Sequence, residues 1–501
     1  MLRIIGSQWG NILLRIVAAL ALTPFLINTI GAEGYGIWIF LNAVVGYLSL
    51  VQAGLPASSL RHLAEQLRGG DYTGFNRTLA SSLVLFATVA IATVLAGVVL
   101  AAIAALTYDI PQRWASDGQL AFLFATLAVS TTLLCNPIMT VLEAHGSYVA
   151  RNLIEMGATV IRTILTVVLV MWSPVLTVVG ISAFIAEICA LVLLVVFVKR
   201  SHSAVKISMR GWDRSTVKSL FSFSTVVLLM AVGARLAYKT DALVIGLAMP
   251  MAAVSVYAVG NTLALYLSRL VNGVAEPLMP MATRLRQSGD EVELRKLFLK
   301  WSKLTMSIAL LIGLYLVVLG PEFVSWWINP EFGEQVADIL RILILSFVVL
   351  LPASAVGFRF LLGLTRPTGL TMAHLIAGLM NLALSASLVG SYGLVGVALG
   401  TAIPNILLAA YIVFLSCKEI GVSVSEYLTY VLFRPLLLAV PLALLLVLLG
   451  EYLVVDTVVG LALTGSIYVA FFMLLWTFVA YRNDPYFDGK ARLISILRRS
   501  Q

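Results

Sequence analysis

Charged side chains are scarce in this sequence. Only 11% of its 501 residues are Asp, Glu, Lys or Arg, whereas 60% are hydrophobic. In soluble domains about a quarter of the residues are charged. A single water-soluble core is therefore excluded, and we predict an all-α integral membrane protein.

Motifs that mark enzymes and metal sites are also missing from the sequence. The three cysteines and four histidines match no disulfide framework or metal-ligand spacing. No G-x-x-x-x-G-K-[ST] phosphate loop occurs, so we do not expect this chain to hydrolyse ATP. The largest predicted outward loops, near 107–116 and 321–336, are too short for a catalytic domain. We predict a protein that is not an enzyme and has no metal or cofactor; coupling to H⁺ or Na⁺ is left open.

Long hydrophobic runs recur along the whole chain. Each is about 17–28 residues long, enough to cross a bilayer as a helix. They predict about 14 transmembrane helices, near 9–29, 35–60, 78–106, 117–142, 151–172, 178–198, 221–246, 251–276, 304–320, 337–362, 371–390, 394–416, 433–450 and 457–481.

Basic residues fall on alternate loops. The loops predicted on the other side of the membrane contain a single basic residue, Arg113. Because Lys and Arg are retained on the cytoplasmic side of membranes, the basic loops are the cytoplasmic ones. We therefore predict a multi-pass membrane protein with both termini in the cytoplasm. This placement explains the net charge of +9 without nucleic acid as a partner and brings the basic loops near anionic membrane lipids.

An internal repeat divides the chain. Residues recur at an offset of about 220 positions: Tyr35 as Tyr257, Leu67–Arg68 as Leu285–Arg286, and Pro137 as Pro352. Each half has six predicted helices, an even number, so the two halves have the same orientation. We therefore predict two six-helix bundles related as parallel repeats, as in transporters with that symmetry. The predicted domains are an N-terminal bundle at 1–198, a basic cytoplasmic linker at 199–220, a C-terminal bundle at 221–416, and a final helix pair with a cytoplasmic tail at 417–501.

Several charges lie inside the predicted spans. The span 221–246 carries Arg235, Lys239 and Asp241, although a charge at mid-bilayer costs about 2.5–3.5 kcal/mol on insertion scales. Arg235 lies roughly 21 Å in from Phe221, and the repeat offset relates it to Arg15. Such residues face a bundle interior or a watery cavity more often than lipid.

Cations outnumber carboxylates within the spans, and we predict a central cationic cavity. Arginine offers a planar fork that fits phosphate oxygens. The predicted substrate-binding residues are Arg15, Arg162, Arg235, Lys239 and Arg269. Residues predicted to line the cavity or couple an ion are Asn42, Glu155, Glu187, Asp241 and Asn261. The alternative is structural pairing, of Arg162 with Glu187 or Glu155 and of Lys239 with Asp241.

Three motifs near the N-terminus resemble a known family. They are G-A-E-G-Y-G-I-W at 31–38, G-Y-L-S-L-V-Q-A-G-L at 46–55 and R-H-L-A-E-Q-L-R-G-G-D at 61–71. They resemble the opening of bacterial polysaccharide and O-antigen (Wzx-type) flippases of lipopolysaccharide biosynthesis, in the MOP exporter superfamily. Gln52 stands where the family pattern has an aspartate, which weakens any role for a carboxylate there.

The resemblance implies a function. Proteins of this kind move undecaprenyl-pyrophosphate-linked oligosaccharides from the cytoplasmic to the periplasmic leaflet by alternating access, with a cationic cavity around the headgroup. The implied partners are the polyprenyl-pyrophosphate-linked glycan, membrane lipids, and glycan polymerase or assembly proteins.

Three other functions stay open at this point. A MATE-like drug or cation antiporter of the same superfamily would be marked by buried carboxylates in one half. A membrane glycan polymerase or glycosyltransferase would carry large external loops with catalytic charges. A scaffold without transport would leave the buried charges unexplained.

Overall fold

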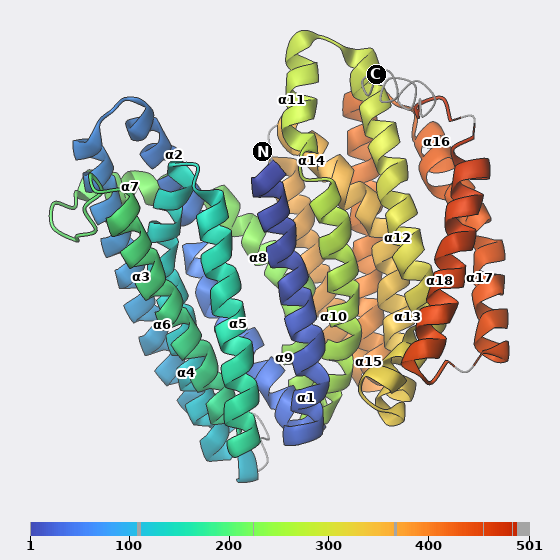
Figure 1. Ribbon diagram of the computed structural model, residues 1–501, viewed down its shortest axis with the longest axis horizontal. Coiled ribbons are helices and arrows are strands. Elements are labelled where there is room, and N and C mark those ends of the chain that lie inside the picture. The colour runs from blue at the N-terminus through green and yellow to red at the C-terminus, as the bar shows by residue number, and fades with distance from the viewer. Residues whose placement is uncertain are drawn as a thin grey trace. The chain divides into compact units, whose positions relative to one another are not determined.

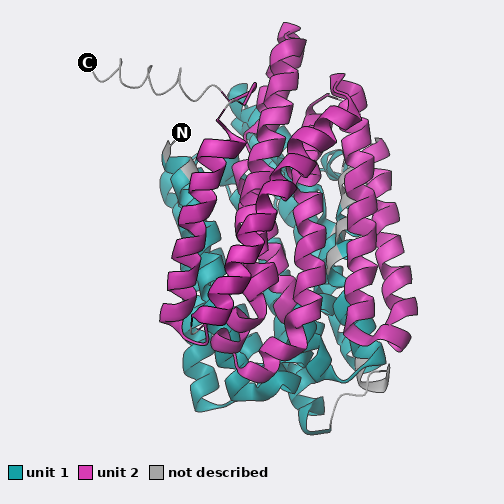
Figure 2. Ribbon diagram, turned by 90° about the vertical axis from the view of Figure 1, so that its right-hand side faces the viewer, with its two compact units in different colours: residues 1–258 teal, residues 259–501 magenta. Residues whose placement is uncertain are grey.

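A computed structural model gives the structure of the chain and describes residues 2–107, 112–223, 225–364, 368–453, 455–482 and 484–487. These residues form helices and no strand, which confirms the predicted all-α membrane fold. The chain forms two compact units, unit 1 at Met1–Ala258 and unit 2 at Val259–Gln501 (Figures 1 and 2). The boundary lies within one helix; the predicted domain limits remain predictions.

Unit 1 is a helical bundle in which α4 packs between α3 and α6, and α5 packs between α1 and α6. Its elements are α1 (Leu2–Leu48), the short 3-10 helix η1 (Ser49–Gln52), α2 (Leu55–Arg68), α3 (Tyr72–Thr107), α4 (Gln112–Ala144), α5 (Tyr148–Trp172), α6 (Leu176–Ser201), α7 (Arg214–Phe223), α8 (Thr225–Lys239), α9 (Asp241–Ala248) and the start of α10 (Met251–Val274).

Unit 2 is built around α13, which packs against both α12 and α15, while α17 packs on α12 and α18. Its elements after α10 are α11 (Leu278–Ser288), α12 (Glu291–Trp327), α13 (Pro330–Pro352), α14 (Phe358–Leu364), α15 (Thr368–Ile420), α16 (Val424–Tyr427), α17 (Arg434–Tyr452) and α18 (Val458–Leu475). Three π-helical segments interrupt them: η2 (Ala353–Gly357), η3 (Leu428–Phe433) and η4 (Trp476–Ala480).

Eleven helices of the described chain are long and apolar enough to cross a membrane. Two of them contain a break at a glycine, because Gly31 in α1 has φ 78° and Gly393 in α15 has φ 56°. Glycine adopts such angles without the steric cost of a Cβ. The breaks fall where the sequence predicted the connections between 9–29 and 35–60 and between 371–390 and 394–416. The total of about 14 crossings remains a prediction.

The predicted span 221–246 differs from the structure. It is interrupted at Thr240, so that α8 ends at Lys239 and α9 begins at Asp241. Asp241 lies in the first turn of α9, where the positive end of the helix dipole stabilises a carboxylate. The hydroxyl of Tyr257 also donates to Asp241 Oδ2 at 2.8 Å.

The predicted outward loop 321–336 is mostly helical. α12 continues to Trp327, and α13 begins at Pro330. Proline is well suited to the first turn of a helix, and the side chain of Asn329 caps α13 by accepting from the Phe332 N–H. The other predicted loop, 107–116, contains residues 108–111, which lie outside the described residues.

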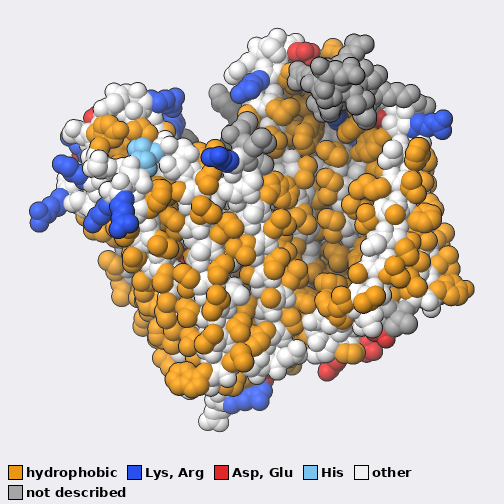
Figure 3. Space-filling view, in the orientation of Figure 1, with side chains coloured by type: hydrophobic (Ala, Val, Ile, Leu, Met, Phe, Trp, Pro, Cys, Tyr) orange, Lys and Arg blue, Asp and Glu red, His pale blue; other side chains and the backbone are white. Residues whose placement is uncertain are grey.

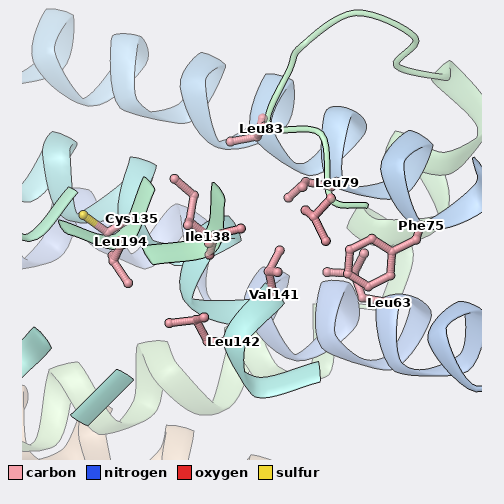
Figure 4. Packing of buried hydrophobic residues seen from close by; sticks show 11 residues of the cluster. Leu63, Phe75, Leu79, Leu83, Cys135, Ile138, Val141, Leu142 and Leu194 are labelled. Carbon is pink, nitrogen blue, oxygen red and sulfur yellow. The ribbon is translucent and has the colours of Figure 1, made fainter. Parts of the chain in front are cut away.

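A hydrophobic cluster holds one end of unit 1 together. It joins Leu63 of α2 to Phe75, Leu79 and Leu83 of α3, and its remaining buried members are Cys135, Ile138, Val141, Leu142, Leu194, Val198 and Val205 (Figure 4). Hydrophobic side chains cover the flank of the unit, while Lys and Arg gather at the end where α2 and α7 lie (Figure 3). The cluster therefore fixes the charged end to the apolar spans.

Candidate functional site

Unit 1 contains a charged cavity of about 530 Å³. Four membrane-spanning helices, α1, α4, α5 and α6, contribute its walls. The polar and charged lining residues include Arg15, Thr132, Asn136, Arg151, Glu155, Thr159, Arg162, Thr163 and Glu187. Arg15, Arg162, Glu155 and Glu187, all predicted from the sequence, thus lie around one space.

The sequence of α5 explains how it forms one wall of this cavity. Polar residues recur every three or four positions along the helix and so fall on one face. The opposite face carries exposed apolar side chains, such as Leu153, Ile164 and Val168, which suit contact with lipid. The helix can therefore cross a membrane while turning Glu155 and Arg162 inward.

Glu155 is the centre of an ion-pair network. Its Oε2 accepts from Arg15 Nη2 at 2.9 Å and from Asn11 Nδ2 at 2.8 Å, and its Oε1 accepts from Arg151 Nε at 3.1 Å. Arg151 Nη1 also donates to Glu143 Oε1 at 2.5 Å. Arg15 and Arg151 are therefore both paired, although the Arg15 side chain is 50% exposed.

Arg162 differs from the other two arginines. It lies seven residues beyond Glu155 on the same face of α5, is exposed to the cavity, and forms no hydrogen bond or ion pair with any described residue. Its opposing charge is Glu187 of α6, which interacts with the Thr132 hydroxyl. Arg162 thus presents to the cavity a side chain without a direct partner in the described chain.

The predicted residues of the span 221–246 have other surroundings. Arg235 Nη2 donates to Ser49 Oγ at 3.0 Å, and a Cβ at Gly46 would lie 2.5 Å from its Nη1. Arg235 thus packs against the end of α1 and η1 and is not among the residues lining the cavity. Lys239 is exposed, and Asp241 is buried. A site shared by Arg15 and Arg235 stays a prediction.

The remaining predicted residues lie apart from the cavity lining. Arg269 is exposed on α10 in unit 2, with its guanidinium 5.7 Å from the centre of the Tyr266 ring. Asn261 is half-buried on the same helix. Asn42 is exposed and donates to the Trp38 carbonyl of its own helix at 2.7 Å.

Sequence reasoning left several cavity residues out of the predicted site. Asn11 and Arg15 are four residues apart, as are Arg151 and Glu155, and this spacing puts each pair on one helix face. Asn136 lines the cavity and donates to Gln52 Oε1 at 2.5 Å. The residue at the family's aspartate position therefore supports the cavity wall through a neutral hydrogen bond.

A larger pocket, of about 680 Å³, lies between α12 and α18 in unit 2. Its lining is almost entirely apolar and includes no charged residue. A pocket of this kind favours an apolar chain and disfavours a charged headgroup, which would lose water there without gaining polar partners. The smaller cavity in unit 1 is therefore the better candidate for a polar substrate.

Comparisons with known proteins agree with this arrangement. A family model described as polysaccharide biosynthesis protein matches residues 77–337. The chain is 23% identical, over 79% of its length and 78% of the relative's, to the uncharacterized membrane protein EpsK of Bacillus subtilis (strain 168). These matches confirm the resemblance to polysaccharide flippases that the N-terminal motifs suggested.

Solved structures share the fold. The lipid II flippase MurJ, in an inward closed conformation, aligns with 95% of this chain and 99% of its own at a TM-score of 0.72 and 13% identity. An inward-facing multidrug resistance MATE family transporter of the MOP superfamily aligns with 82% of this chain and 98% of its own at a TM-score of 0.70 and 14% identity. The family and these folds agree with the expectation that the chain is not an enzyme.

Proposed function

Because the chain belongs to the family of polysaccharide biosynthesis proteins, we propose that it flips a lipid-linked oligosaccharide across the bacterial inner membrane. The substrate is an undecaprenyl-pyrophosphate-linked glycan that enters from the cytoplasmic leaflet and leaves in the periplasmic leaflet. Both termini are cytoplasmic in this proposal. The cavity of unit 1 binds the anionic headgroup while the prenyl tail stays in lipid.

The observation that carries the proposal is the free guanidinium of Arg162. A charge within a membrane-spanning segment is costly and marks a substrate pathway more often than it marks packing. Here the charge faces a cavity and is not cancelled by a direct ion pair with any residue that the structure describes. A pyrophosphate offers several oxygens to the planar fork of arginine, so it would supply the missing partner.

Glu155 gives the site a means of releasing its ligand. It holds Arg15 and Arg151 in the absence of substrate, and it competes with phosphate oxygens for the same N–H donors. Phosphate binding would shift the half-exposed Arg15 away from Glu155, and return of Arg15 to Glu155 would favour release. A proton or Na⁺ taken up by Glu155 or Glu187 would couple the cycle to an ion gradient. Arg235, Lys239 and Arg269 remain candidates for other steps of alternating access.

A drug or cation antiporter is the second candidate. It is favoured by Glu155 and Glu187, two carboxylates in one cavity of one unit, and by the MATE fold. An organic cation would pair with the glutamates and be repelled by Arg162. The two functions therefore predict opposite effects of removing the Arg162 charge.

Transport by purified protein in vesicles tests the proposal. Wild type, Arg162→Gln and the control Arg341→Gln, which removes an exposed arginine of unit 2, are supplied with a polyprenyl-pyrophosphate oligosaccharide or with ethidium. Glycan translocation is measured by its access to a lectin on the far side. We expect Arg162→Gln alone to lose glycan translocation. Unchanged glycan translocation by Arg162→Gln, at equal protein abundance, would overturn the proposal, and faster ethidium transport would favour the antiporter.

A further inference from the structure

The segment between α6 and α7, residues 202–213, is tied to the bundle at both ends. Near its start, Asn76 of α3 donates from Nδ2 to the Ala204 carbonyl at 3.1 Å and accepts from the Lys206 N–H at 2.8 Å. Val205, between these two contacts, is buried in the hydrophobic cluster of Figure 4. Near its end, the Asp213 N–H donates to Ser81 Oγ at 3.0 Å. These contacts hold residues 202–213 against the bundle, and we call this segment the tethered loop.

The tethered loop presents apolar and basic side chains together. Met209 is 49% exposed and Trp212 is 50% exposed, although both are hydrophobic. Exposed basic side chains lie beside them and continue into α7, and none has an ion-pair partner among the described residues: Lys206, Arg210, Arg214 and Lys218. The surface therefore combines uncompensated positive charge with exposed hydrophobic area.

The only carboxylate close to this surface in sequence is already engaged. Asp213 accepts from the Thr216 N–H at 2.8 Å and from Thr216 Oγ1 at 2.9 Å, and also from the Ser215 hydroxyl. These bonds cap α7 and lower the pKa of Asp213 to about 2. Asp213 is thus committed to holding α7, and the basic residues keep an excess of positive charge.

The apolar part of α3 sets the depth of the tethered loop. Arg77 is the last charged residue at this end of α3, and residues 78–107 of the helix contain no charged side chain. Ser81 lies four residues beyond Arg77, where this uncharged stretch begins. Its bond to Asp213 therefore holds Trp212 near the end of the apolar span, the level that tryptophan prefers.

We propose that the tethered loop and the first turns of α7 form a binding site for anionic phospholipid headgroups. Trp212 and Met209 enter the interface, and Arg210, Arg214 and Lys218 contact lipid phosphates. A membrane is the occupant that fits, because a soluble partner would meet the basic groups but not at the depth that Ser81 imposes. The site is separate from the charged cavity and independent of what the cavity transports.

Lipid binding to the purified full-length protein tests this site. Phosphatidylglycerol or phosphatidylcholine is titrated into protein in detergent, and bound lipid is counted by native mass spectrometry while the melting temperature is followed. The test variant is Arg210→Gln/Arg214→Gln/Lys218→Gln. The control variant, Arg284→Gln/Lys296→Gln/Lys418→Gln, removes equal charge from exposed positions of unit 2.

We expect wild type and the control variant to retain phosphatidylglycerol over phosphatidylcholine, with a rise in melting temperature. The test variant should bind phosphatidylglycerol more weakly, by roughly fivefold for each charge removed. Equal binding by the test variant, or an equal loss in the control variant, would overturn the proposal.

Two further measurements identify what is bound. Trp212→Ser should weaken retention of phosphatidylglycerol yet leave its salt dependence unchanged, because the charges remain; an unaltered affinity would contradict insertion of Trp212. Glycerol phosphate and inorganic phosphate should not raise the melting temperature at millimolar concentration. If they raise it as phosphatidylglycerol does, and the test variant abolishes the effect, the site binds free anions and the lipid proposal fails.

Discussion

Each unit keeps a cation inside its membrane-spanning helices, and the two surroundings are opposite. In unit 2, the ammonium of Lys303 in α12 donates to the Ala480 carbonyl at 2.7 Å and pairs with Asp484. Its Nζ lies 4.6 Å from the centre of the Tyr430 ring and 4.8 Å from that of Tyr481. The side chains of Lys303 and Asp484 are only 6% and 0% exposed.

Asp484 is equally well satisfied. The Tyr430 hydroxyl donates to Oδ1 at 2.7 Å or Oδ2 at 2.8 Å, and the Tyr486 N–H donates to Oδ1 at 2.9 Å. In unit 1, by contrast, Arg162 faces a cavity and has no direct partner among the described residues. A charge enclosed by partners fixes helices to one another, whereas a charge left open can meet a ligand. Because Lys303 and Arg162 both lie within helices, they differ only in whether the charge has partners and whether a ligand can reach it.

Replacing Lys303 by Met should have the largest effect on stability. It leaves Asp484 buried without its counter-ion, and breaking a buried pair costs about 3–5 kcal/mol. We expect a large fall in melting temperature in detergent. Lys303→Met/Asp484→Asn removes both charges and should recover part of the loss. If the double variant is no more stable than Lys303→Met, the pair does not act as described.

Replacing Arg162 should change binding and leave stability nearly intact. Removing an unpaired, accessible arginine should alter unfolding free energy by less than about 0.5 kcal/mol. Affinity for a prenyl pyrophosphate, measured by calorimetry, should fall about 10- to 100-fold in Arg162→Gln, because a charge-assisted hydrogen bond contributes about 1.5–3 kcal/mol.

Arg162→Lys sharpens the same contrast. It keeps the charge but loses the planar fork, so its affinity should lie between those of wild type and Arg162→Gln. A melting temperature of Arg162→Gln as low as that of Lys303→Met would show that Arg162 is structural.

The difference between these two cations was only partly visible in the sequence. Hydrophobic run length predicted most helices, because a bilayer sets their length. The face of α5 that joins Glu155 to Arg162 also followed from helical spacing. The predicted span 304–320 begins just after Lys303, because nothing local indicates that Asp484, far along the chain, encloses this lysine. Partners distant in sequence decide whether a buried charge is cancelled.

The break at Thr240 escaped prediction for a similar reason. Residues 221–246 have the hydropathy of one continuous span, yet Asp241, which begins α9, accepts a hydrogen bond from Tyr257 on another helix. The glycines at 31 and 393 left clearer signals, because each falls between two apolar runs.

Glu155→Gln should change the affinity for a prenyl pyrophosphate less than Arg162→Gln does, and in the opposite direction. Partly exposed ion pairs contribute about 0.2–1 kcal/mol each, and Glu155 forms two. Neutralising it frees Arg15 and leaves Arg151 paired with Glu143 alone, so affinity for prenyl pyrophosphate should rise by about 2- to 10-fold. Release, and with it turnover of glycan transport, should slow. A variant that binds the pyrophosphate more weakly than wild type would contradict competition between Glu155 and phosphate.

The smallest effect is expected at Asp213. Unlike Lys303 and Asp484, this carboxylate is not fully buried. Its folded pKa of about 2 is below the usual 3.8, so its contribution to stability is present above pH 3.8 and is lost as pH falls through about 2. Between pH 5 and 8, Asp213→Ala should therefore differ from wild type by a constant amount. The difference should be confined to faster amide exchange in the first turn of α7, measured by mass spectrometry. A fall in global melting temperature approaching that of Lys303→Met would mean that exposure does not separate the two kinds of charge.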